Sequence, residues 1–134
     1  MDKRSLKVGV NLGGWISQYP AYDYGHFDAF IREEDIRRIA GWGCDHVRLP
    51  VDYPVFEMEN EPGKINERGM EYVHQCLRWC QENGLKVILD LHKAPGFDFD
   101  QCFDRPAVPA FLPRLSKMNE LFFLAAKARI VYRW

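Results

Sequence analysis

The sequence predicts an α/β fold in which parallel strands alternate with helices. Two stretches carry this prediction, His46–Val51 and Leu85–His92, which are short and mostly apolar, as a strand buried on both faces requires. Each follows a helix-like segment that ends in glycine, and each has charged or polar residues within the apolar run or at its end. Polar side chains at the carboxyl end of an apolar strand are typical of the active-site edge of an α/β protein.

The first strand is predicted at Lys7–Asn11, before a glycine pair. The pair permits a tight backbone path, so Trp15, directly after it, is expected to project into the loop as an exposed aromatic. Ile16–Phe30 is interpreted as a long loop with five aromatic residues. A loop of this length inside a compact domain usually serves a function.

Two helices are predicted between the strands. Arg32–Ala40 begins with acidic residues and ends with arginines, an order that suits the helix dipole. Glu67–Asn83 repeats apolar residues at steps of three and four and ends before Gly84. The segment before it, Asp52–Asn66, is predicted to be a loop. The first part of the chain therefore has the order β-α-β-α-β with parallel strands.

Composition argues against several classes of function. The chain has 134 residues, 47% of them hydrophobic, and a formal net charge of −1, so neither nucleic acid nor an anionic membrane is expected as a partner. No apolar run is long enough to span a bilayer, and the charged N-terminus lacks the apolar part of a signal peptide, so a cytoplasmic protein is expected. The four cysteines have neither zinc-finger nor redox spacing and are expected to be free thiols.

Three motifs occur in series: Gly9–Trp15, Asp45–Val51 and Gly84–His92. Together they resemble the N-terminal third of glycoside hydrolase family 5, the cellulase-like retaining β-glycosidases. The resemblance implies a (β/α)8 barrel whose active site lies at the carboxyl ends of the strands. It also implies a β-glucan or oligosaccharide substrate and a double displacement by two glutamates about 5 Å apart, without a metal or other cofactor.

The resemblance gives four residues a place in the site. Arg48 corresponds to the strand-two arginine that steadies the nucleophile carboxylate, and His92 to the strand-three histidine that lines the sugar subsite at the cleavage point. Asn11 and Trp15, from the first motif, are expected to support substrate binding, Trp15 by facing the sugar. The residues themselves agree with these roles, because a lone arginine within an apolar strand must be paired or contact a ligand.

The chain departs from the family pattern after its third strand. A barrel of this kind needs about 250 residues, so residues 1–106 are expected to supply about three βα units, with both catalytic glutamates beyond the end. Asn60-Glu61-Pro62 spells the acid/base tripeptide, but no apolar strand precedes it, and it is interpreted as a solvated acidic loop. Residues 107–134 are an atypical tail, either a third helix over Ser116–Arg129 that is cut short or a missense segment from a shifted reading frame.

Three hypotheses for the function remain open. The leading one is a fragment of a β-glucan-cleaving glycosidase that is inactive by itself. The second is a non-catalytic carbohydrate-binding remnant or an inert truncation product. The third, a metal-dependent barrel hydrolase with Asp90, His92 and His46 as ligands, lacks ligands from other strands. A three-stranded piece of a barrel also leaves apolar edges exposed, so self-association is expected.

Overall fold

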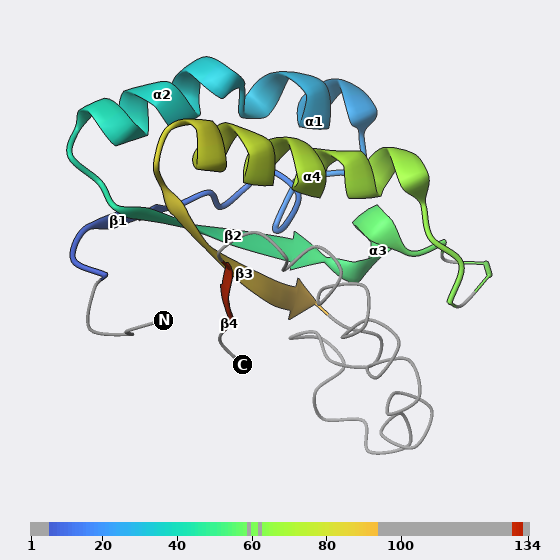
Figure 1. The fold of residues 1–134 in the computed structure, drawn as a ribbon. Coiled ribbons are helices and arrows are strands. Elements are labelled where there is room, and N and C mark those ends of the chain that lie inside the picture. The colour runs from blue at the N-terminus through green and yellow to red at the C-terminus, as the bar shows by residue number, and fades with distance from the viewer. Residues whose placement is uncertain (1–5, 59, 62, 94–129, 133–134) are drawn as a thin grey trace.

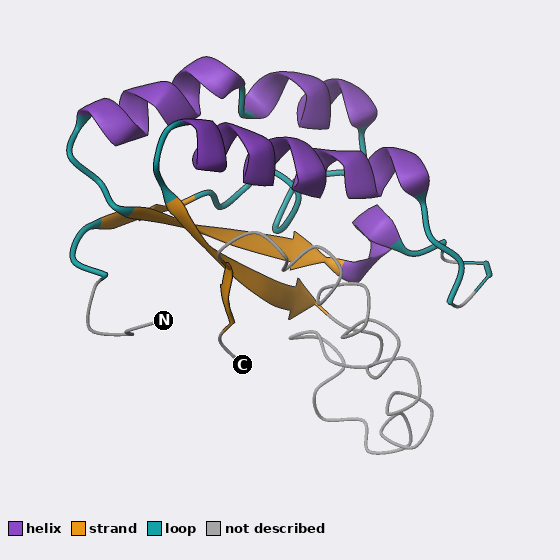
Figure 2. Cartoon of the chain, viewed as in Figure 1, coloured by secondary structure: helices purple, strands orange, loops and turns teal. Residues whose placement is uncertain are grey.

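The structure is a computed structural model and describes residues 6–58, 60–61, 63–93 and 130–132. The described strands form one parallel sheet in chain order: β1 (Gly9–Asn11), β2 (His46–Asp52), β3 (Lys86–Lys93) and β4 (Ile130–Tyr132). Figures 1 and 2 show the long helices on one face of this sheet. The predicted α/β class with parallel strands is confirmed, and the sheet is open in the part that the structure describes.

Four helices are described: α1 (Tyr24–Phe30), α2 (Glu33–Gly41), α3 (Tyr53–Phe56) and α4 (Glu67–Glu82). The helices α2 and α4 lie close to their predicted ranges. The helices α1 and α3 fall in segments predicted as loops, and the loop prediction is wrong there. The causes are local: Asp23 caps α1 by accepting a hydrogen bond from the Gly25 amide at 3.0 Å, and Pro54 lies in the single turn of α3.

The strand β4 is absent from the sequence prediction. It pairs in parallel with residues 87–89 of β3. Residues 130–132 are therefore extended and belong to the sheet. The expectation that the chain contributes three strands is corrected to four among the described residues. The helix expected over residues 116–129 lies outside the described residues.

Each central strand has one face toward the helices and one face away from them, here called the open face. In β2, Val47, Leu49 and Val51 are fully buried, whereas Arg48 between them is only partly buried. The strand β3 repeats this pattern, with Val87 buried and its neighbours partly exposed. Because side chains alternate along a strand, a charged residue in an apolar run reaches the open face without disturbing the core.

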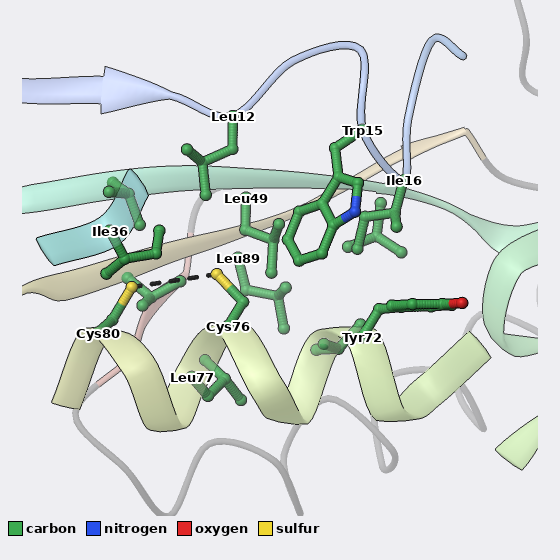
Figure 3. Close-up of a cluster of buried hydrophobic side chains, with 14 of the residues drawn as sticks. Leu12, Trp15, Ile16, Ile36, Leu49, Tyr72, Cys76, Leu77, Cys80 and Leu89 are labelled. Atoms are coloured by element: carbon green, nitrogen blue, oxygen red, sulfur yellow. Dashed lines mark hydrogen bonds between the residues drawn. The ribbon is translucent and has the colours of Figure 1, made fainter. Parts of the chain in front are cut away.

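The hydrophobic core lies between the sheet and the helices. Figure 3 shows Leu49 and Leu89 from the sheet opposite Cys76 of α4. Cys80 lies one turn further along α4, with its sulfur 4.0 Å from that of Cys76. The hydrogen bond between the two thiols, together with burial, raises the pKa of Cys76 well above its usual range, so the thiol stays neutral.

The prediction of free thiols is confirmed for three cysteines, Cys44, Cys76 and Cys80. The fourth, Cys102, lies outside the described residues. The two buried thiols of α4 act as small apolar side chains in the core.

Asp45 joins the amino ends of β1 and β2. Its carboxylate accepts hydrogen bonds from the amides of Lys7 and Val8, at 2.7 and 3.3 Å, and lies 2.6 Å from His46 Nδ1. The hydrogen bond with His46 lowers the pKa of Asp45 below its usual value. The imidazole of His46 lies over Gly9, where a Cβ atom would come within 2.3 Å of the ring. The absence of a side chain at Gly9 therefore avoids a steric clash with His46.

Replacing Asp45 by asparagine should lower the free energy of unfolding at neutral pH, because the folded chain favours the charged form of Asp45. A folded-state pKa below the unfolded value gives a contribution that is present above the unfolded pKa and is lost as pH falls through the folded pKa. Urea unfolding of wild type and Asp45→Asn, from neutral pH down to about pH 2, should show a stability difference that shrinks in acid. Glu34→Gln, at an exposed carboxylate, is the control. A difference that stays constant with pH would contradict the assigned role.

The helix α4 packs closely against α3 at Gly69. A Cβ atom at this position would lie 1.5 Å from the backbone oxygen of Val55, so any larger residue must displace one of the two helices. Glycine inside a helix normally destabilises the helix. At position 69 the close packing of α4 against α3 explains why a glycine is present.

Gly69→Ala should therefore lower the free energy of unfolding by about 1–3 kcal/mol, the usual cost of overpacking. The matched control is Gly41→Ala in α2, where a Cβ atom would meet nothing within 4 Å. That substitution should leave stability unchanged or raise it by up to about 1 kcal/mol through helix propensity. Chemical denaturation of both variants checks this, and equal effects would show that packing at Gly69 is not the constraint.

Candidate active site

Polar side chains gather on the open face of the sheet toward the carboxyl ends of β1, β2 and β3. Asn11 ends β1, Arg48 lies within β2, and Asp90 and His92 lie near the end of β3. The parallel register pairs Asn11 of β1 with Arg48 of β2, and Arg48 in turn with Ile88 of β3. Asp90 lies two residues after Ile88 along β3. Alternation along β3 turns Asp90 and His92 to the same side, as the sequence predicts.

Arg48 connects this group of four residues, here called the Arg48 cluster. Its Nη1 donates a hydrogen bond to Asn11 Oδ1 at 2.6 Å, and its Nη2 donates to Asp90 Oδ2. His92 Nδ1 lies 3.4 Å from Arg48 Nη2 and 3.4 Å from Asp90 Oδ2. The prediction that Arg48 and His92 lie near the same edge of a parallel sheet is confirmed.

The Arg48 cluster is partly withdrawn from water. The side chains of Arg48, Asp90 and His92 are 37%, 21% and 23% exposed. Partial burial strengthens the ion pair relative to one on the surface and costs each charge part of its hydration. The Arg48 side chain remains partly exposed, and the planar fork of donors on its guanidinium suits carboxylate and hydroxyl oxygens. The cluster is therefore able to bind an acidic side chain or the hydroxyl groups of a sugar.

The glycine pair after β1 makes room for Asn11. A Cβ atom at Gly13 would lie 2.7 Å from the Asn11 amide nitrogen, and Gly14 has a φ of 78°, in the left-handed region that favours glycine. The sequence shows this pair but not its purpose. The structure shows that Gly13 leaves the Asn11 amide free to meet Arg48.

Trp15 does not belong to the Arg48 cluster, and its predicted exposure and sugar-facing role are wrong. The indole is 0% exposed, and its Nε1 donates a hydrogen bond to the backbone oxygen of Phe27 at 2.8 Å. Figure 3 shows the ring inside the core, above α4 and near Tyr72. The physical reason is α1, which the sequence prediction lacks, because Phe27 at its centre covers the loop and supplies the acceptor for the indole.

The aromatic residues of segment 16–30 pack on one another around the buried Phe27. Tyr19, Tyr22 and Tyr24 meet its ring edge to face, and Asn66 donates hydrogen bonds to the hydroxyls of Tyr22 and Tyr24, at 3.0 Å each. Burial raises the pKa of Tyr22 well above its usual value. Tyr24 and Phe27 also pack on Tyr72 of α4, whereas Tyr22 and Phe30 keep 43% and 48% of their surface exposed.

A buried carboxylate, missed by sequence reasoning, fixes the loop after β1 to the end of β2. Asp52 Oδ1 accepts a hydrogen bond from the Ser17 hydroxyl at 2.8 Å, and Oδ2 accepts one from the Gln18 amide at 3.2 Å. The Asp52 amide donates in return to the oxygen of Ile16 at 3.0 Å. No sequence motif marks this arrangement, because its partners are separated by about 35 residues.

The remaining candidates from the sequence stand apart from the Arg48 cluster. Glu61, in the acidic loop, is exposed and pairs with Lys64 at 2.8 Å, which agrees with a solvated loop. His46 lies at the amino end of β2, bonded to Asp45, whereas Asp90 lies toward the carboxyl end of β3. The ligand set of the metal hypothesis is therefore not assembled. Within the described ranges no three histidine, cysteine or acidic residues gather around a common point for a metal ion.

Comparison with known proteins decides the family. Residues 8–113 match the family model described as Cellulase (glycosyl hydrolase family 5). The chain belongs to glycosyl hydrolase family 5. The predicted family is thus confirmed.

The chain is similar to part of longer relatives in the family. It is 52% identical over 95 residues to Endoglucanase C of Acetivibrio thermocellus, an alignment that covers 71% of this chain and 28% of the relative. It is 43% identical over 100 residues to Cellodextrinase A of Ruminococcus flavefaciens, which covers 75% and 29%. The chain therefore spans less than a third of the length of either relative.

A solved family 5 structure has the same fold. The GH5-4 broad specificity endoglucanase from Ruminococcus flavefaciens superposes with a TM-score of 0.73 at 22% identity, over 96% of this chain and 38% of that chain. The predicted partial barrel is confirmed at the level of the fold, as an open parallel sheet with helices on one face. Among the described residues, no helix has the length and apolar character needed to cross a membrane.

Trp15→Phe should lower the free energy of unfolding by about 1–3 kcal/mol, because the Phe27 oxygen loses its buried donor and the smaller ring leaves a void. The control is Trp42→Phe, at a tryptophan that is 66% exposed, and it should change stability by less than about 0.5 kcal/mol. Thermal or urea unfolding measures both. A Trp15→Phe variant with full stability but weaker sugar binding would restore the sugar-facing role that the structure argues against.

Proposed function

We propose that this chain forms the first βα units of a retaining glycosidase that cleaves β-glucans. The observation that carries the proposal is the Arg48 cluster, which lies on the open face toward the carboxyl ends of adjacent parallel strands in a family 5 chain. In a (β/α)8 barrel this edge of the sheet holds the active site. The names of the relatives, an endoglucanase and a cellodextrinase, support a β-glucan or cello-oligosaccharide as the substrate class.

The cluster is suited to binding and charge stabilisation. Arg48 places a fixed positive charge beside the site, where it would steady a carboxylate nucleophile. His92 adds a ring nitrogen that is able to hydrogen-bond a sugar hydroxyl. Asn11 and Asp90 hold Arg48 in place from the two neighbouring strands.

The chemistry of a retaining glycosidase needs more than this cluster supplies. Double displacement uses a nucleophile and a separate acid/base, about 5 Å apart across the scissile bond. In the described part of the chain, Asp90 is the carboxylate that contacts Arg48, and it is engaged in an ion pair. One carboxylate cannot fill both roles. We therefore propose that the 134-residue chain binds its substrate weakly and does not hydrolyse it.

Sugar binding and hydrolysis by the chain are the first measurements. Cellotetraose titrated into the 15N-labelled chain should shift the side-chain signals of Arg48 and His92, and incubation with soluble β-glucan should release no product above a His92→Ala control. His74→Ala, at a half-exposed histidine of α4, should bind like wild type. Absence of binding would favour the inert product. Turnover that disappears in His92→Ala would contradict the proposed inactivity.

Fragment complementation separates a glycosidase portion from a simple binding remnant. The chain is co-expressed with the part of Endoglucanase C that follows its matched region, and assembly is checked by size-exclusion chromatography. The assembled pair should hydrolyse β-glucan, Arg48→Ala should abolish turnover, and Arg37→Ala, at an exposed surface ion pair, should not. Assembly without turnover would contradict the proposal.

The proposal extends to self-association of the isolated chain. The strands β1 and β4 are the outer strands of the described sheet, and the β3 residues that face away from the helices are only partly buried. Unpaired edges and open faces of this kind favour association. Sedimentation velocity over a range of concentrations tests this, and a single monomer species throughout would refute it.

A further inference from the structure

Asp90 and Asn11 hold the Arg48 guanidinium from both sides, next to His92. The Oδ2 atom of Asp90 accepts a hydrogen bond from Arg48 Nη2, the same nitrogen that lies 3.4 Å from His92 Nδ1. The other end of the guanidinium is held by Asn11 through Nη1. Bonds at both nitrogens from the two flanking strands fix the plane of the rigid guanidinium and the direction of its remaining N–H groups.

The neutral His92 ring has two tautomers, and the cluster discriminates between them. A guanidinium only donates hydrogen bonds and a carboxylate only accepts them, so Nδ1 either accepts from Arg48 or donates to Asp90. The two distances are equal, at 3.4 Å. The contact with Arg48 has the alignment of a hydrogen bond, whereas the contact with Asp90 is a close approach without that alignment. An Nδ1 that accepts from Arg48 leaves the ring proton on Nε2.

We propose that Asp90 is a positioning residue, which acts through Arg48 to hold His92 as the Nε2–H tautomer. Asp90 orients the guanidinium by accepting from one N–H of Nη2. The second N–H of Nη2 then meets His92 Nδ1. Asp90 needs no contact with substrate for this role.

The consequence concerns what His92 offers to a ligand. The Nε2–H group of the imidazole donates a hydrogen bond, so His92 selects an acceptor oxygen of the substrate. A sugar hydroxyl whose own proton is donated to another group is one such acceptor. This part of the inference rests on the proposed function. The tautomer itself does not, because it is a property of the chain without a sugar.

The tautomer is read directly from two-bond 1H–15N correlation spectra of the imidazoles in the whole 134-residue chain, at a pH where the His92 shifts no longer change. In wild type, His92 Nδ1 should have the shift of a bare ring nitrogen and Nε2 that of a protonated one. In Asp90→Ala the two shifts should move toward each other, because the guanidinium is free to turn. Asp90→Asn should restore the wild-type pattern, since its amide oxygen accepts the same hydrogen bond. Glu71→Ala, beside His74, should leave the His92 signals unchanged.

A second arm measures cellotetraose affinity of the same proteins. Loss of one oriented hydrogen bond should weaken binding about tenfold in Asp90→Ala, with recovery in Asp90→Asn. Wild-type His92 protonated on Nδ1 would overturn the inference, and this holds even if Asp90→Ala does not fold. Identical His92 spectra in wild type and Asp90→Ala would overturn it as well. Wild type that binds no sugar but shows the expected tautomer change would instead refute the proposed function and leave the role of Asp90 standing.

Discussion

Three residues of β2, Val47, Leu49 and Val51, are fully buried beneath the helices, and the rest of the structure depends on this apolar face. Val47, Leu49 and Val51 supply the apolar face that α2 and α4 cover, and the core in Figure 3 exists because they face the same way. Of the residues between them, Pro50 is also buried, whereas Arg48 lies on the open face and is only partly buried. Arg48 is therefore able to sit in the middle of an apolar strand without burying an unpaired charge in the core.

The Arg48 cluster contributes little that stability alone would require. A partly exposed ion pair is typically worth about 1 kcal/mol or less, and burying its charges offsets part of the gain. Apolar residues at the same positions would pack at least as well. What the cluster provides is orientation, since a guanidinium held from both neighbouring strands has one defined direction in which to meet a ligand. Under the proposed function, a substrate would meet an arginine whose direction is already set.

Sequence reasoning succeeds where a local pattern determines the structure. The apolar runs of β2 and β3, each after a helix that ends in glycine, predict parallel strands, and Arg48 and His92 stand out because they interrupt those runs. Their meeting across the sheet follows from strand direction alone. The family resemblance then supplies the roles that the pattern cannot.

The failures have two causes: α1 and α3 depend on local caps and turns that carry no clear helical period, whereas Trp15 and Asp52 depend on distant partners. The helix α1 has too few apolar positions to show a helical period, and its stability comes from rings that pack on Phe27 and from its cap at Asp23. Trp15 follows two glycines, a context typical of an exposed loop, and only the cover from α1 makes it a core residue. Asp52 looks like the first polar residue of a loop, while its partners lie near Ser17. The contacts of Trp15 and Asp52 join residues 12 and 35 positions apart, so a short window of sequence does not show them.

The anchoring of the loop after β1 has a thermodynamic consequence for any ligand. Trp15 fixes this loop to α1, and the carboxylate of Asp52 fixes it again at Ser17 and Gln18. This loop follows directly after Asn11, which ends β1 and holds one end of the Arg48 guanidinium, so Asn11 is joined to a segment that has little conformational freedom. Ordering a flexible segment costs free energy at the moment of binding. Here the loop loses its conformational entropy when the chain folds. A ligand that binds at the open face would therefore not have to offset the cost of ordering this loop.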